Sequence, residues 1–143
     1  MAWLIDGSNV LGTLRRNRES VEAKRELARL CAAFARAKRT RVTCYFDGAE
    51  PAAFARHLGN ATIVFSGART ADDLIAQRVE ESASNHTLVT SDLALIARVS
   101  RRRVRTMSAH EFVHELGAIQ SETETAEEDW QAYFSDPKNR EEF

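Results

Sequence analysis

Aspartates stand at or soon after the ends of four apolar segments in this chain. Asp6, Asp47 and Asp92 each follow one such segment, and the pair Asp72 and Asp73 comes after a fourth. Carboxylates brought to one site repel one another, and a hard divalent cation that binds carboxylate oxygens removes that cost. Such an ion can activate water and neutralise charge that develops on a phosphodiester. The set therefore predicts phosphodiester hydrolysis with Mg²⁺ or Mn²⁺ as cofactor.

Each aspartate on its own also has an ordinary structural explanation. Asp72 and Asp73 fit the first turn of a helix, where carboxylates stabilise the helix dipole. Asp92 fits a helix N-cap, and Asp47 with Gly48 fits a tight turn. The joint occurrence of the acids within a basic part of the chain favours a common site over these separate roles.

The charge of the chain is divided unevenly along its length. Residues 1–118 carry 18 Lys and Arg against 13 Asp and Glu, a net charge of +5, whereas residues 119–143 carry 2 against 8, a net charge of -6. Arginine suits bidentate contact with phosphate, so a basic body around an acidic site fits a nuclease that binds a polyanion. We expect Arg15, Arg16 and Arg69 to contact phosphates beside the site. A solvated basic surface without a partner would show similar clusters.

The apolar segments and the patterns between them predict the elements that position these residues. Five short segments favour strands and alternate with helical patterns, which indicates parallel pairing with right-handed crossovers in a three-layer α/β domain. Ligands gather beyond the carboxyl ends of strands in such sheets, which is where the aspartates fall. The predicted strands are residues 2–5, 42–46, 62–65, 87–90 and 104–107.

Local signals predict four helices. Residues 20–37 show the spacing of three and four residues between apolar positions that is typical of an amphipathic helix. Thr70 and Ser108 each begin a sequence that resembles a capping box, so helices are expected to start there. Pro51 is suited to open a short helix that Gly59 closes.

Composition gives no sign of a membrane or of an oxidising compartment. The length of 143 residues favours one domain with one core, and no apolar run approaches the eighteen or so residues of a membrane span. The start of the chain has no basic segment and reaches Asp6 early, unlike a secretory signal. Cys31 and Cys44 are expected to be reduced apolar fillers, with no disulfide-linked partner. We therefore expect a cytoplasmic protein.

Five motifs lie at the predicted strand ends and helix starts. They are Ile5-Asp-Gly-Ser-Asn-Val10, Tyr45-Phe-Asp-Gly48, Val64-Phe-Ser-Gly67, Thr70-Ala-Asp-Asp-Leu-Ile75 and Val89-Thr-Ser-Asp92. Their order and spacing resemble the YacP-like branch of the NYN, PIN-like ribonucleases. The resemblance implies a PIN-like (Rossmann-like) fold over residues 1–118, with a parallel five-strand sheet of order 3-2-1-4-5 flanked by helices. It also implies a metal-dependent endoribonuclease whose substrate is RNA.

The resemblance also implies roles for individual residues. By position, Asp6, Asp72 and Asp92 would bind the metal, and no further acid follows Asp92 within a helical turn, so one ion rather than two is expected. Asn9 would orient Asp6 or a metal-bound water, and Asp73 would act behind the metal ligands. The supporting residues would be Ser8, Asp47 and Ser91.

Two other functions stay open at this point. An RNA-binding PIN-like module without catalysis would share the fold, although it gains nothing from negative charge in its cleft. A zinc peptidase is suggested by the H-E-x-x-H pattern, with Glu127 or Glu128 as a third ligand. Against it, Glu111 already fits the capping box of Ser108, and the apolar residues between the histidines fit the core-facing side of a helix. The pattern is formed by His110, Glu111, Phe112, Val113 and His114.

Residues 119–143 are predicted to form an acidic tail with a short aromatic helix. Trp130, Tyr133 and Phe134 fall at helical spacing and are expected to dock on the domain after disorder up to about Thr125. The alternative is a tail that lies across the arginine-rich surface and competes with RNA. The sequence leaves the oligomeric state open.

Overall fold

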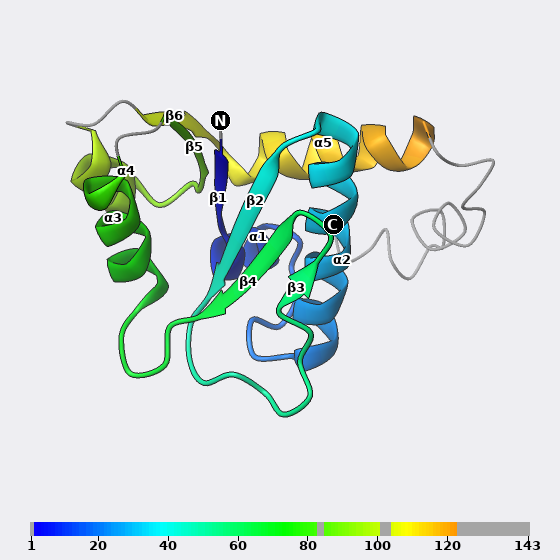
Figure 1. Ribbon diagram of the computed structural model, residues 1–143, viewed down its shortest axis with the longest axis horizontal. Coiled ribbons are helices and arrows are strands. Elements are labelled where there is room, and N and C mark those ends of the chain that lie inside the picture. Colours follow the sequence, from blue (N-terminus) through cyan, green and yellow to red (C-terminus); the bar gives the residue numbers. More distant parts are fainter. Residues whose placement is uncertain (1, 83–84, 101–103, 123–143) are drawn as a thin grey trace.

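A six-stranded sheet forms the centre of the protein (Figure 1). The structure is a computed structural model that describes residues 2–82, 85–100 and 104–122. The strands lie in the order β3-β4-β2-β1-β5-β6. All neighbouring pairs are parallel except β3 with β4, which is antiparallel. The strands are β1 (Ala2–Asp6), β2 (Arg41–Phe46), β3 (His57–Leu58), β4 (Ala61–Phe65), β5 (His86–Val89) and β6 (Val104–Met107).

The prediction of a five-strand, all-parallel sheet was wrong because it omitted β3. This strand was assigned to a helix between Pro51 and Gly59, but within the segment Ala53 has a left-handed φ of 57°, which α-helical continuation does not allow. His57 and Leu58 instead pair with β4 across the turn. Phe54 is buried and packs edge to face on Phe65 of β4, with ring centroids 4.9 Å apart. Tertiary packing therefore decided this segment against its local helix signals.

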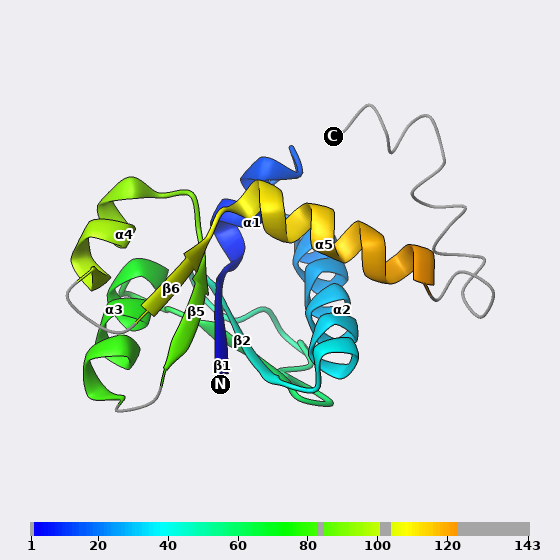
Figure 2. The ribbon, with the colours of Figure 1, turned by 90° about the horizontal axis from the view of Figure 1, so that it is seen from above.

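Helices cover both faces of the sheet, which confirms the predicted three-layer α/β architecture (Figure 2). One face carries α1 (Gly7–Thr13), α2 (Val21–Lys38) and α5 (Ala109–Glu122), and the other carries α3 (Ala71–Glu81) and α4 (Leu93–Val99). Side chains alternate between these layers along β1, where Leu4 packs with α3 and α4 while Ile5 packs on the opposite face. Helix α1 had not been predicted.

Side-chain caps fix where the longer helices begin. Ser20 Oγ accepts a hydrogen bond from Ala23 N at the start of α2, and Thr70 Oγ1 accepts one from Asp73 N at the start of α3. Ser108 and Glu111 form the predicted capping box at α5, with Glu111 N donating to Ser108 Oγ at 3.1 Å. Each cap satisfies a backbone N–H group that has no partner within the helix.

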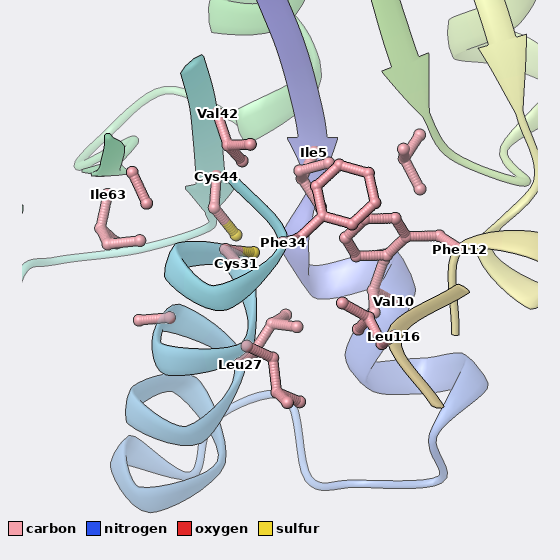
Figure 3. Packing of buried hydrophobic residues seen from close by; sticks show 14 of the residues in the cluster. Ile5, Val10, Leu27, Cys31, Phe34, Val42, Cys44, Ile63, Phe112 and Leu116 are labelled. Atoms are coloured by element: carbon pink, nitrogen blue, oxygen red, sulfur yellow. The ribbon is translucent and has the colours of Figure 1, made fainter. Parts of the chain in front are cut away.

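The larger core lies between the sheet and the layer of α1, α2 and α5 (Figure 3). Phe34 of α2 is fully buried at its centre and makes edge-to-face contacts with Trp3 and Phe112, at centroid distances of 4.8 and 5.1 Å. Cys31 and Cys44 are buried free thiols in this core, and burial raises the pKa of Cys44 well above its usual range. The cysteines thus act as apolar fillers, as predicted.

Helix α5 continues across the predicted domain boundary at residue 118 and reaches Glu122. The rest of the predicted acidic tail and its aromatic helix lie outside the described residues, as does the arginine run 101–103. Within the described part of the chain, no helix has the length and apolar character needed to cross a membrane.

Candidate active site

An open pocket of about 360 Å³ lies at the carboxyl ends of the central strands. Strand order reverses between β1 and β5, and a crevice at such a point is the usual ligand site of an open parallel sheet. Four of the five candidate aspartates, which come from four separate segments, line this one pocket. The lining residues are Asp6, Ser8, Asn9, Arg18, Asp47, Arg69, Thr70, Asp72 and Asp92.

Asp6 is the most buried carboxylate of the pocket, with 4% of its surface exposed. It is the last residue of β1 and the N-cap of α1, where its Oδ1 accepts a 3.4 Å hydrogen bond from Asn9 N. Its Oδ2 accepts a hydrogen bond of 2.9 Å from Thr90 Oγ1. Burial raises the pKa of Asp6 to about 6, against the smaller lowering effect of these two donors. Asp6 is thus fixed in position, and ionisation of its buried carboxyl group lowers the stability of the folded protein.

The loop between β5 and α4 is attached to the β1–α1 junction by polar contacts. Thr90, which donates to Asp6, also accepts a hydrogen bond from Asp92 N at 3.1 Å. Asn9 Oδ1 accepts one from Ser91 N at 2.8 Å. Asp92 caps α4 through one oxygen, Oδ1, which accepts from Ala94 N and Leu95 N. The capping role considered for Asp92 therefore coexists with its position in the pocket.

Asp72 and Asp47 complete the acidic lining from the other side of β1. Asp72 lies in the first turn of α3, and burial raises its pKa, with further contributions from the nearby carboxylates of Asp92 and Asp47. Asp47 follows β2, and its Oδ1 accepts a hydrogen bond of 2.8 Å from Ala71 N, next to Asp72. Asp47 therefore holds the start of α3 against β2, beyond the turn role considered for it.

The β1–α1 junction approaches β2 so closely that only glycine fits at position 7. A Cβ atom on Gly7 would lie 2.5 Å from the Phe46 ring and 2.7 Å from the Tyr45 carbonyl oxygen. Ser8 Oγ then accepts a hydrogen bond from Asp47 N at 3.3 Å. The contact between these segments brings Asp6 and Asp47 to the same pocket.

Four residues of the predicted site do not line the pocket. Asp73 faces α4, where Arg98 donates to it at 3.0 Å and thereby lowers its pKa. Arg16 pairs with Glu26 at 2.7 Å. The others are Ser91, whose hydroxyl accepts from Ala109 N, and Arg15, which is exposed. The expected rim hydrogen bond of Ser91 is thus directed to the start of α5 instead.

Sequence reasoning also missed three residues of this region, of which Thr70 lines the pocket but was predicted only as a helix cap. Thr90 lies within one of the predicted motifs, but its bridge between Asp6 and Asp92 was not foreseen. Arg18 was counted among the basic residues, but no role was assigned to it. A hydroxyl two residues before a strand-end aspartate was the signal available for Thr90. No sequence signal separated Arg18 from the nearby arginines, because the turn after α1 decides which of them faces the pocket.

The donor chemistry of the pocket suits Mg²⁺ or Mn²⁺, which prefer carboxylate oxygen and water. Among the residues that the structure describes, however, no three His, Cys, Asp or Glu side chains converge closely enough to enclose an ion. Mg²⁺ keeps several waters and binds through one or two carboxylates, so a partly hydrated ion fits this set and a fully dehydrated one does not. Asp72 and Asp92 are the best candidates for direct ligands of the ion, because their carboxyl groups are near enough to interact with each other.

The H-E-x-x-H segment lies on α5, and none of its residues lines the pocket. His110 and His114 are exposed, and Glu111 Oε1 lies 3.2 Å from Ser108 Oγ within the capping box. No third ligand for this pair is found among the described residues. The two predicted candidates, Glu127 and Glu128, lie outside the described part of the chain. The capping explanation therefore accounts for Glu111.

The fold and the acidic pocket define an α/β domain of the nuclease type. The profile of the YacP-like NYN domain matches residues 3–142, and the chain belongs to this family. The match extends beyond the predicted nuclease domain of residues 1–118 into the C-terminal segment. At the family level this membership identifies an RNA-processing nuclease domain.

Solved structures show the same fold. A crystal structure of Rae1 (YacP) from Bacillus subtilis has a TM-score of 0.72 and 22% sequence identity, covering 92% of this chain and 82% of that one. A crystal structure of a tryptophan-to-leucine mutant of the same protein has a TM-score of 0.68 and 24% identity, covering 87% and 79%. No curated protein matches this chain significantly.

Proposed function

We propose that this protein is a metal-dependent endoribonuclease that hydrolyses RNA phosphodiesters in the acidic pocket. The observation that carries the proposal is the convergence of four aspartates from four separate segments on one pocket that arginines also line. Carboxylates alone would repel RNA, whereas carboxylates that hold a cation beside arginines attract it. The combination fits phosphodiester chemistry better than it fits simple phosphate binding.

A divalent cation in the pocket, Mg²⁺ or Mn²⁺, would activate water and neutralise charge that develops on the phosphodiester. Asp72 and Asp92 would hold this ion, with Asp6 as the third metal-binding residue, directly or through a water. Thr90 and the Asn9 backbone fix the Asp6 carboxylate, so the residue keeps its position when the ion leaves. Asn9 and Ser8 hold neighbouring loops, and both act as positioning residues.

The arginine of the pocket that the sequence had singled out is Arg69. Its Nη1 donates to the neutral side chain of Gln77 at 2.7 Å, which orients the guanidinium without neutralising it. We assign Arg69 to binding of an RNA phosphate at the pocket. Arg15 and Arg16, which do not line the pocket, would act further along the RNA.

Cleavage of end-labelled single-stranded and hairpin RNAs tests the proposal. With Mg²⁺ or Mn²⁺ the protein should release internal fragments, and a chelator should abolish their release. Asp6→Asn and Asp72→Asn should each lower the rate at least a hundredfold. Asp73→Asn is the matched comparison, because Asp73 adjoins Asp72 but bonds to Arg98 outside the pocket, so its loss should be much smaller.

Two outcomes would contradict the proposal. Cleavage that continues at the wild-type rate in Asp6→Asn would rule out the assigned pocket. RNA binding that is equally strong with metal and with chelator, without any cleavage, would instead establish a binding module that has lost catalysis.

A further inference from the structure

Arg18 is an arginine of the pocket whose role is not yet assigned. It lies in the segment between α1 and α2, three residues beyond Arg15, and lines the same pocket as the carboxylates. Arg69 reaches this pocket from the loop that leads to α3. Arg18 precedes α2 and Arg69 precedes α3, and these two helices cover opposite faces of the sheet, so the two arginines come from segments that lead to different layers.

The backbone around Arg18 is held in a defined turn. Arg15 adopts a left-handed φ of 58°, and Arg16 N donates to Leu11 O at 2.9 Å, which closes the end of α1. Asn17 Oδ1 then accepts a hydrogen bond from Glu19 N at 2.9 Å, and this turn has Arg18 at its centre. The position of Arg18 is thus set by bonds on both sides of it.

The guanidinium of Arg18 lies directly over the backbone of α1. A Cβ atom on Gly12 would be 2.4 Å from Arg18 Nη2 and 3.0 Å from its Nε, so the guanidinium end of this exposed side chain would have to shift if the residue were alanine. Glycine in the last turn of a helix costs about 1 kcal/mol relative to alanine. The close approach of the guanidinium is a physical reason for glycine at this position.

The charge environment of Arg18 differs from that of Arg16 and of Arg98. Arg16 is paired with Glu26, and Arg98 is paired with Asp73. Within the described part of the chain, no carboxylate lies within ion-pair distance of Arg18. An arginine held in an acidic pocket without its own carboxylate partner keeps its hydrogen-bond donors for a ligand.

We infer that Arg18 is a substrate-binding residue that contacts an RNA phosphate in the pocket, and that Gly12 leaves the space in which its guanidinium lies. The inference rests on the proposed ribonuclease function and adds a second phosphate-binding arginine to Arg69. A bidentate guanidinium contact on the side of α1 and α2, opposite Arg69, holds the RNA backbone over the carboxylates from two layers. The predicted substrate is therefore a polynucleotide strand rather than a mononucleotide.

Binding of a fluorescent single-stranded RNA to the full chain, measured by anisotropy in chelator at several salt concentrations, tests this role without cleavage. Arg18→Ala should weaken binding about five- to twentyfold and reduce the slope of log K against log salt by about 0.7, the contribution of one phosphate contact. Arg18→Lys should keep the slope but recover only part of the affinity. Arg36→Ala is the matched control, because Arg36 is an exposed arginine in the last turn of α2 and does not line the pocket.

Gly12→Ala gives an independent test that leaves the charge in place. The methyl group displaces the flexible end of Arg18, and alanine favours the helix, so the protein should fold while RNA affinity falls by less than in Arg18→Ala. In cleavage assays with Mg²⁺, both variants should raise KM with kcat within about twofold of wild type.

The outcomes separate this inference from the proposed function. Wild-type affinity and an unchanged salt slope in Arg18→Ala would overturn the role of Arg18, even if the protein cleaves RNA. A reduced kcat with unchanged KM would also overturn it, because it would indicate a role confined to the transition state. Failure of the wild-type protein to bind and cleave RNA would overturn both proposals.

Discussion

Replacement of Asp6 by asparagine should stabilise the protein at alkaline pH. Asp6 is buried at the end of β1, and its pKa in the folded protein is about 6, compared with 3.8 for an unperturbed aspartate. Folding therefore takes up protons between about pH 4 and pH 6, and wild-type stability falls as pH rises through this interval. Above pH 6 the ionised carboxylate remains buried, and its cost stays constant.

The size of this cost follows from the difference between the two pKa values. A difference of about two pH units corresponds to about 3 kcal/mol in the free energy of unfolding. The asparagine side chain of the variant would keep an oxygen for one of the two donors, Asn9 N and Thr90 Oγ1, but would lose the stronger charged acceptor. We therefore expect Asp6→Asn to gain roughly 1–3 kcal/mol at pH 8 and close to nothing at pH 4.

Urea unfolding followed by circular dichroism, in chelator at pH 4, 6 and 8, measures this gain. Asp73→Asn is the control with the opposite sign, because Arg98 lowers the pKa of Asp73. Its stabilising contribution is present above the unfolded pKa and is lost on acidification, so this variant should not be more stable than wild type at pH 8. A less stable Asp6→Asn at pH 8, or a gain that does not shrink toward pH 4, would refute the burial argument.

Further predictions concern the core, the close approach at the site, and catalysis. Phe34→Ala should lower the free energy of unfolding by about 3–5 kcal/mol in urea, because it removes a fully buried ring that contacts Trp3 and Phe112. Gly7→Ala should lower the free energy of unfolding by about 1–3 kcal/mol in the same assay, since its Cβ meets backbone and ring atoms of β2. An unchanged stability would show that β2 moves to accept the methyl group. RNA cleavage at low Mg²⁺, measured as kcat/KM, should fall on acidification as Asp6 becomes protonated, at or below its metal-free pKa of about 6 because a bound cation favours the carboxylate; a profile flat from about pH 4 to pH 8 would exclude Asp6 as an essential ionised group. His114→Ala should leave RNA cleavage and metal content unchanged, whereas loss of bound zinc would restore the peptidase hypothesis.

Local signals were sufficient for most of the elements. The capping residues Thr70 and Ser108 predicted helix starts that the structure has, because a cap depends on residues three positions apart. The helix predicted after Pro51 was wrong for the opposite reason. Its conformation depends on pairing with β4 and on burial of Phe54, which are contacts between segments.

The site divides in a similar way. Asp6, Asp72 and Asp92 were found because strand ends and helix starts carry a local pattern, and parallel strands deliver their carboxyl ends to one edge of the sheet. Arg15, Arg16 and Arg18 are indistinguishable by type, and the turn after α1 with the Arg16–Glu26 pair decides that Arg18 is the one in the pocket.

The sequence by itself determined the alternation of strands and helices, the set of acids and the basic body around them, since these depend on residue type and short spacing. Only the tertiary structure decided the edge strand β3, the link from Thr90 to both Asp6 and Asp92, and the separation of Asp73 from Asp72. The physical reason is that these features arise where side chains from distant segments compete for the same space and the same hydrogen-bond partners. Which carboxylates share a pocket, and which arginine faces them, is settled by that competition.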